Sequence, residues 1–177
     1  MKKLIVLCLT LISLIASGKE PQGLFGLYIG DSVLNHITKA ELAEKVKTNE
    51  AKGDYYDIFV TNRVHNKSPF FNDYWVTIDK NNKIHSITGT SNIVNLDVCL
   101  SQINTVEGII LEAYDISFIS SESTYSSTTF HSKTYEGINY LELNCRLDNV
   151  NNNVTSMLFL DSKQLVDMRN EYYNSGI

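Results

Sequence analysis

The order of hydrophobic and polar positions predicts that extended segments and amphipathic helices alternate along the chain. Residues 24–29 form a short apolar run between two glycines, which indicates a strand or an extended segment. Thr38 is followed three residues later by Glu41, the spacing of a capping box, so a helix is expected from there to about Thr48. Three β-branched and aromatic runs follow, at residues 55–61, 74–79 and 83–88.

The last two of these runs are expected to pair as an antiparallel hairpin. Residues 79–83 read Asp-Lys-Asn-Asn-Lys, and Asn tolerates the positive φ that a tight turn requires. Ile84 and Ile87 stand at an odd spacing, which predicts a bulge or a change of face near Ser86.

The second half of the chain predicts a long helix, several strands and a final helix. Asn95 or Asp97 is expected to cap a helix that reaches about Tyr114, because its apolar positions recur at intervals of three and four. Strands are expected at residues 116–120, 128–135, 138–147 and 154–160, with a polar Ser/Thr stretch between the first two. Ser162 is expected to cap a helix over residues 163–173.

These elements predict an α+β fold with an antiparallel sheet and two or three helices. The element order within residues 24–90 resembles that within residues 95–173, and the segments 81–87 and 151–157 have similar sequences. A tandem pair of αβββ units would explain both observations, and because the similarity is short, chance explains it equally well.

The first 18 residues have the layout of a secretory signal peptide. Lys2 and Lys3 precede an apolar run at residues 4–16, and small residues stand before a cut after Gly18. The run is about 13 residues long, whereas a membrane-spanning helix needs about 20, so cleavage is favoured over a retained anchor. Cys8 lies inside the apolar run and follows Val and Leu, which disfavours a lipoprotein. We therefore expect a single exported domain over residues 19–177.

Charge and cysteine content narrow the class of protein further. Removal of the signal changes the formal net charge from −5 to −7, and an acidic chain without a basic run disfavours nucleic acid or anionic lipid as partner. The mature chain keeps two cysteines, Cys99 and Cys145, which in an oxidising compartment are expected to form a disulfide. The alternative is a pair of buried free thiols.

The residues do not predict a catalytic, metal or cofactor site. The four histidines lack metal-ligand spacing, and acidic pairs such as Asp54/Asp57 and Glu142/Asp148 are expected in any acidic chain. One loop, residues 62–72, stands out as a contact surface because it combines cations with aromatic residues. Its binding candidates are Arg63, His65, Lys67, Phe70 and Phe71. The alternative is that the two phenylalanines pack back against the sheet.

Two short motifs carry resemblances to known proteins. Gly30-Asp31-Ser32-Val33-Leu34 resembles the first block of the GDSL esterases, which implies Ser32 as a nucleophile. That family's Gly-x-Asn-Asp and late Asp-x-x-His blocks are missing, and a serine without a base is a poor nucleophile. The longer pattern Gly-Leu-x-x-Gly-Asp-Ser at residues 26–32 is similar to a class of small exported bacterial proteins, which implies export. The tandem αβββ arrangement resembles BamE-type envelope domains and β-lactamase inhibitor proteins, which implies protein binding.

Three functional hypotheses follow. The first is a non-enzymatic periplasmic or secreted domain that binds another protein, one with a basic surface, as an inhibitor, immunity factor or envelope accessory. The second is a small-molecule or glycan-binding domain that stacks its ligand on Tyr55, Tyr56, Tyr74 and Trp75. The third and most remote is a hydrolase acting through Ser32.

Overall fold

The computed structural model describes residues 20–48 and 53–174 of the chain, so the expected signal peptide lies outside the described residues. The first described half contains β1 (Gly23–Leu24), β2 (Leu27–Tyr28), a 3-10 turn (Val33–Asn35), α2 (Lys39–Leu42), β3 (Val46–Lys47), β4 (Tyr55–Phe59), β5 (Asp73–Asp79) and β6 (Ile84–Ile93). The second contains α3 (Leu96–Ala113), β7 (Ile119–Tyr125), β8 (Thr128–Glu136), β9 (Asn139–Asp148), β10 (Asn153–Ser162) and α4 (Lys163–Asn174).

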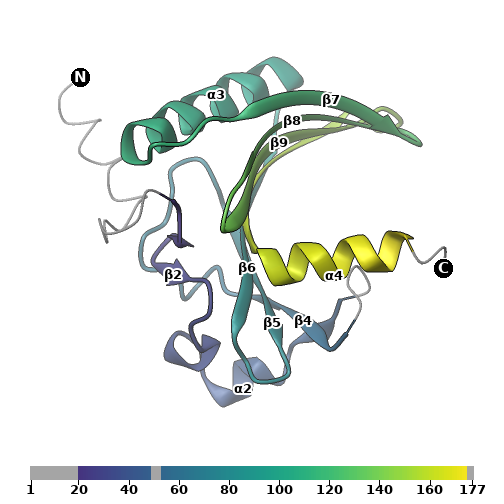
Figure 1. Ribbon diagram of the computed structural model, residues 1–177. Coiled ribbons are helices and arrows are strands. Elements are labelled where there is room, and N and C mark those ends of the chain that lie inside the picture. Colours follow the sequence, from purple (N-terminus) through teal and green to yellow (C-terminus); the bar gives the residue numbers. More distant parts are fainter. Residues whose placement is uncertain (1–19, 49–52, 175–177) are drawn as a thin grey trace.

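One curved antiparallel sheet organises these elements. Its eight strands lie in the order β3-β4-β5-β6-β10-β9-β8-β7, while β1 and β2 form a small separate hairpin. Figure 1 shows α3 on the convex side of the sheet and α4 on the concave side. We call these sides the outer face and the inner face. The α+β class and the antiparallel sheet are confirmed.

The two halves of the chain meet at the centre of the sheet. β6 ends the first half and β10 ends the second, and these two strands pair in antiparallel register from Val154 opposite Ile93 to Asp161 opposite Ser86. The four strands of the first half and the four strands of the second therefore extend in opposite directions from this central pair. One continuous core of apolar side chains lies on the outer face and includes residues from both halves.

The N-terminal segment differs from its prediction. Residues 24–29 form a tight hairpin instead of one strand, with positive φ at Phe25 and Gly26. This turn directs the Phe25 ring into the core, where its centroid lies 4.8 Å from that of Tyr74 and 5.9 Å from that of Phe71. The ring lies over Gly89, where an added Cβ would be only 2.8 Å from Phe25 Cζ. Gly89 thus makes room for the N-terminal segment on the sheet.

The capping box is confirmed, although the helix it begins is shorter than expected. The Glu41 N–H donates to Thr38 Oγ1, and the Thr38 N–H donates to Glu41 Oε2 at 2.8 Å. The helix ends at Leu42 instead of Thr48, and β3 then pairs with the edge of β4. A helix this short has little stability of its own, so the backbone pairing available at the sheet edge prevails.

Three other local predictions are confirmed. In the β5–β6 hairpin, Thr77 lies opposite Ser86, but Ile78 lies opposite Ile84. His85 is therefore an extra residue in β6, and this bulge lets both Ile84 and Ile87 be buried. Asn95 caps α3, because its Oδ1 accepts the Val98 N–H at 3.0 Å. Ser162 caps α4, because its hydroxyl accepts the Leu165 N–H at 3.2 Å.

The disulfide between Cys99 and Cys145 is confirmed and joins α3 to β9. Both cysteines are fully buried in the core of the outer face, together with Ile103, Val106 and Ile110 of the same helix. The polar Ser/Thr stretch after residue 120, for which no strand was expected, forms most of β7. Within the described ranges, no helix is both long and apolar enough to cross a membrane.

Candidate binding face of the sheet

α4 covers only part of the inner face of the sheet. The side chains on the rest of this face lie outside the hydrophobic core. Strand alternation and register place side chains on the inner face in rows that cross the strands. α4 covers the rows at one end of this face, where Tyr55 packs with Leu165 and Met168, and where Thr77 and Asp161 are buried. The following rows lie beyond this helix contact, and their residues on β4–β6 and β8–β10 are Phe59, Trp75, Thr88, Phe159, Glu142, Thr134, Asp73, Thr90, Met157, Asn144, Ser132, Asn92, Thr155, Arg146, Phe130, Asn153, Asp148 and Thr128. Asn144 is buried among them.

An exposed aromatic pair lies at one end of the uncovered rows. Phe59 and Trp75 are directly opposite each other on β4 and β5, and their rings meet edge to face at a centroid distance of 4.7 Å. Phe59 is 48% exposed and Trp75 is 42% exposed. Large rings fixed against each other and left open to water are typical of interface anchors, because covering them with a partner releases bound water.

A polar cluster lies further along the same face, around Glu142. The Glu142 carboxylate accepts hydrogen bonds from Tyr140 Oη at 2.6 Å, Ser132 Oγ at 2.9 Å and Asn144 Nδ2 at 3.0 Å. All three donors are neutral. Burial, and next the Glu142 carboxylate, raise the pKa of Tyr140 well above its usual range, so the phenol remains a donor. The carboxylate is therefore held in a fixed position without a cation beside it among these contacts.

The uncovered rows carry an excess of negative charge. Asp73, Glu142 and Asp148 lie on these rows. Arg146 is the only basic side chain that alternation places there among the described residues. Arg146 lies over the Phe130 ring at 5.9 Å from its centroid. The carboxylate of Asp161 belongs to the part under α4 and is bonded by Arg169 of that helix, while burial raises its pKa. The open part of the face thus suits a positively charged partner.

The loop at residues 62–72 does not form the contact surface expected from the sequence. Phe71 is buried at 3% exposure and Phe70 is half-buried, with its carbonyl accepting Gln102 Nε2 at 2.8 Å. The Tyr74 hydroxyl donates to the Phe71 carbonyl and accepts the Ser68 N–H, which holds the loop against the core. The alternative of packing back against the sheet is therefore the one observed.

The three cations of that loop lie on the surface without the two phenylalanines beside them. Arg63 is engaged by Glu41, at 2.6 Å between Nε and Oε1, and so ties the loop to α2. His65 and Lys67 are exposed.

The other predicted sites are also not formed in the structure. Tyr55 and Tyr74 are buried, so the four-ring stacking platform is not formed, and Trp75 instead pairs with Phe59. The sequence does not identify Phe59 as a site residue. Its run predicts a strand, but alternation alone does not show which face of the sheet remains uncovered. Among the described residues, no histidine or carboxylate hydrogen-bonds to the Ser32 hydroxyl.

A serine, a histidine and an aspartate do lie in line elsewhere, at the start of α4. Ser162 Oγ is 3.0 Å from His85 Nδ1, and His85 Nε2 is 3.5 Å from Asp79 Oδ2. Each member has a structural partner: the Ser162 hydroxyl caps α4, and Asp79 accepts the N–H groups of Asn81 and Lys83 in the hairpin turn. Ser162 and His85 are each 8% exposed, so this line ties the β5–β6 hairpin to α4 inside the protein.

Over the described ranges, no three His, Cys, Asp or Glu side chains gather in a way that could hold a metal ion. Comparisons with protein-family models, with curated proteins and with solved structures gave no match for this chain. The inner face of the sheet is therefore the best candidate site on its geometry and charge.

Proposed function

We propose that the protein is an exported, non-enzymatic domain that binds a basic protein partner through the inner face of its sheet. The observation that carries this proposal is the exposed Phe59–Trp75 pair on a sheet face that has carboxylates around it and, among the described strand residues, only Arg146 as a cation. A signal-like N-terminus and a disulfide between Cys99 and Cys145 support export to an oxidising compartment. An inhibitor, an immunity factor or an envelope accessory would act in this way.

The aromatic pair supplies the first test. The tagged mature protein is used to capture partners from the envelope and medium of its own host, alongside a Phe59→Thr/Trp75→Thr variant. Threonine keeps the strand propensity while removing the rings. We expect one stoichiometric partner that binds the variant about 30-fold more weakly, as for a hot spot worth about 2 kcal/mol.

A matched control removes exposed apolar groups elsewhere. Val94 and Val150 are 89% and 73% exposed and lie outside the inner face, so a Val94→Thr/Val150→Thr variant should bind like the unchanged protein. If both double variants lose partner binding equally, the binding is nonspecific adhesion. If both retain it equally, the interface lies elsewhere.

Charge supplies the second test. Asp73→Lys should weaken the captured complex and reduce its dependence on salt, because it reverses a carboxylate on the uncovered rows. Glu112→Lys changes the net charge equally on α3 and serves as control. If both variants bind alike, the electrostatic part of the proposal is wrong.

A small-molecule or glycan ligand is the second candidate, and the exposed Trp75 ring favours it in part. Trp75 is the single tryptophan of the chain, so its fluorescence reports on this surface alone. A saturable change with a glycan, together with a capture experiment that yields no partner, would replace protein binding by this alternative.

A further inference from the structure

The last strand of the sheet, β7, has a free edge. Among the described strands it pairs only with β8 and ends the strand order, and all seven of its residues are exposed. Natural edges are usually protected by lysine, proline, a bulge or a covering element. β7 contains no lysine or proline, and its register with β8 is unbroken from Ile119 to Tyr125.

The hairpin geometry decides which backbone groups face away from β8. Tyr125 lies opposite Thr128 across a two-residue turn, and such a closing pair exchanges both of its hydrogen bonds. Hydrogen-bonded pairs then alternate along the strand, so the N–H and C=O groups of Ser120, Glu122 and Thr124 point outward. These groups form a ladder that an additional strand can continue.

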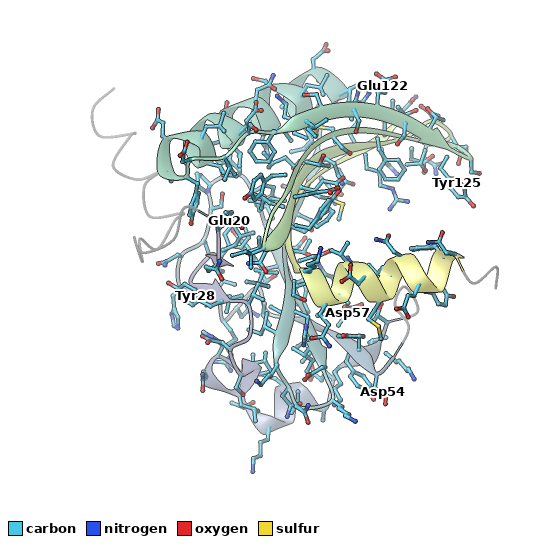
Figure 2. All side chains as sticks on the ribbon, in the orientation of Figure 1. Glu20, Tyr28, Asp54, Asp57, Glu122 and Tyr125 are labelled. Carbon is cyan, nitrogen blue, oxygen red and sulfur yellow. A yellow bond between two sulfur atoms is a disulfide. The ribbon has the colours of Figure 1, made fainter. Side chains whose placement is uncertain are left out.

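A pocket adjoins the same edge on the outer face. It has a volume of about 330 Å³ and lies between α3 and the β7–β8 hairpin. The apolar side chains of Leu100 and Ile103 contribute to it from α3, and Ser120, Glu122, His131 and Lys133 from the strands. Figure 2 shows Glu122 on the outer side of the arch and Tyr125 at its free end. Side chains of an added strand would alternate between the two faces, so every second one would lie beside this pocket.

The charges of the pocket favour a basic side chain. Lys133 is occupied by Glu107 of α3, at 2.5 Å between Nζ and Oε2. Glu122 lies 3.2 Å from His131 Nδ1, but its side chain remains 66% exposed. An exposed carboxylate next to apolar side chains suits lysine or arginine. The aliphatic part of such a side chain can pack on Leu100 and Ile103 while its charged group pairs with Glu122.

We propose that the β7 edge receives an extended segment of a partner protein as an additional antiparallel strand, with one lysine or arginine of that segment placed in the pocket beside Glu122. This surface lies on the outer face and does not depend on the inner-face proposal. Because the ladder is made by main-chain groups, the segment needs an extended backbone and one basic side chain, and little other sequence.

The test uses a peptide of the length of β7. The ¹⁵N-labelled mature protein is titrated with acetylated, amidated Thr-Val-Thr-Lys-Thr-Val-Thr, and with the same peptide carrying glutamate at its centre. We expect saturable shifts of the Ser120, Glu122 and Thr124 amides. The lysine peptide should bind up to about fivefold more tightly, as expected for a charge pair worth up to about 1 kcal/mol.

Two variants separate the ladder from the charge. Thr124→Pro removes an outward N–H that β8 does not use, so the hairpin should persist while peptide binding is lost. Ser120→Pro makes the same change at the other end if the first variant disturbs the fold. Glu122→Gln should abolish the preference for lysine over glutamate and leave the ladder intact.

Three results would overturn the proposal. The first is the absence of shifts at these amides with millimolar peptide, and the second is equal binding of the two peptides. The third is a concentration-dependent shift of the same amides without peptide, together with a doubled sedimentation mass, which would assign the edge to a second copy of this chain.

Discussion

At the scale of single residues, several side chains combine a local role with a long-range one. Glu41 closes the capping box of α2 and also holds Arg63 of the β4–β5 loop. Gly89 is an interior residue of a central strand whose missing side chain admits Phe25 from the distant N-terminus. The capping spacing of Glu41 is visible in the sequence, whereas the partner that makes Gly89 necessary is not.

Glu41 should titrate far below an ordinary glutamate. The hydrogen bond from Arg63, and next those from Thr38, lower the pKa of Glu41 from 4.5 to about 2. A lowered folded-state pKa means that this group's stabilisation is present above about pH 4.5 and is lost as the pH falls toward 2. Carboxyl NMR titration should show the low midpoint, and Arg63→Gln should raise it. An unchanged midpoint in that variant would show that Arg63 is not its main cause.

Two glycines should respond oppositely to alanine. At Gly89 the new Cβ would be 2.8 Å from Phe25 Cζ and 3.1 Å from Phe71 Cγ, so Gly89→Ala should lower the free energy of unfolding by about 1–3 kcal/mol. At Gly108, exposed within α3, nothing lies within 4 Å of the new Cβ, so Gly108→Ala should raise it by about 1 kcal/mol. Urea denaturation of both variants measures this. Stabilisation by Gly89→Ala would contradict the packing described for Phe25, and destabilisation by Gly108→Ala would contradict the open surroundings of Gly108.

At the scale of elements, α3 and α4 divide the sheet into a closed and an open surface. α3 buries an apolar stripe on the outer face and is fixed there by the disulfide to β9. α4 is fixed by the Ser162 cap at its N-terminal end and by the pair between Arg169 and Asp161 further along, and it covers one end of the inner face. This difference in coverage exposes the Phe59–Trp75 pair.

The disulfide should make a large contribution to stability. Cys99 and Cys145 are 46 residues apart, and the chain-entropy model for such a loop gives about 4 kcal/mol. A Cys99→Ala/Cys145→Ala variant should therefore unfold at a clearly lower urea concentration, with α3 the first element to lose amide protection. Equal midpoints in both proteins would show that packing alone holds α3 in place.

At the scale of the whole molecule, the two halves should unfold as one unit. β6 and β10 pair along most of their length, and one apolar core includes both halves. Trp75 fluorescence reports on the first half, and far-UV circular dichroism reports on all elements. The two signals should change at the same urea concentration with one transition. Two separate midpoints would instead identify residues 24–90 and 95–173 as independent domains.

The sequence by itself determined the local elements, because their signals come from neighbouring residues. Thr38, Asn95 and Ser162 mark the starts of the helices, Asn82 marks a turn, and alternation marks most of the strands. The even pair of cysteines predicted the disulfide without any knowledge of the packing. Weak local signals predicted less: the polar residues of β7 did not indicate a strand, and the segment at 24–29 indicated a strand or an extended segment where a hairpin forms.

Only the tertiary structure decided which surfaces remain open. Phe71 and Trp75 are both large aromatic residues in the same half of the chain, yet one is buried and the other is nearly half exposed. That difference depends on where α4 ends, on which strands pair and on what covers each face, all of which are contacts between residues far apart in the sequence. The candidate site could not be read from a motif because it consists of side chains on separate strands, brought together by the register of the sheet.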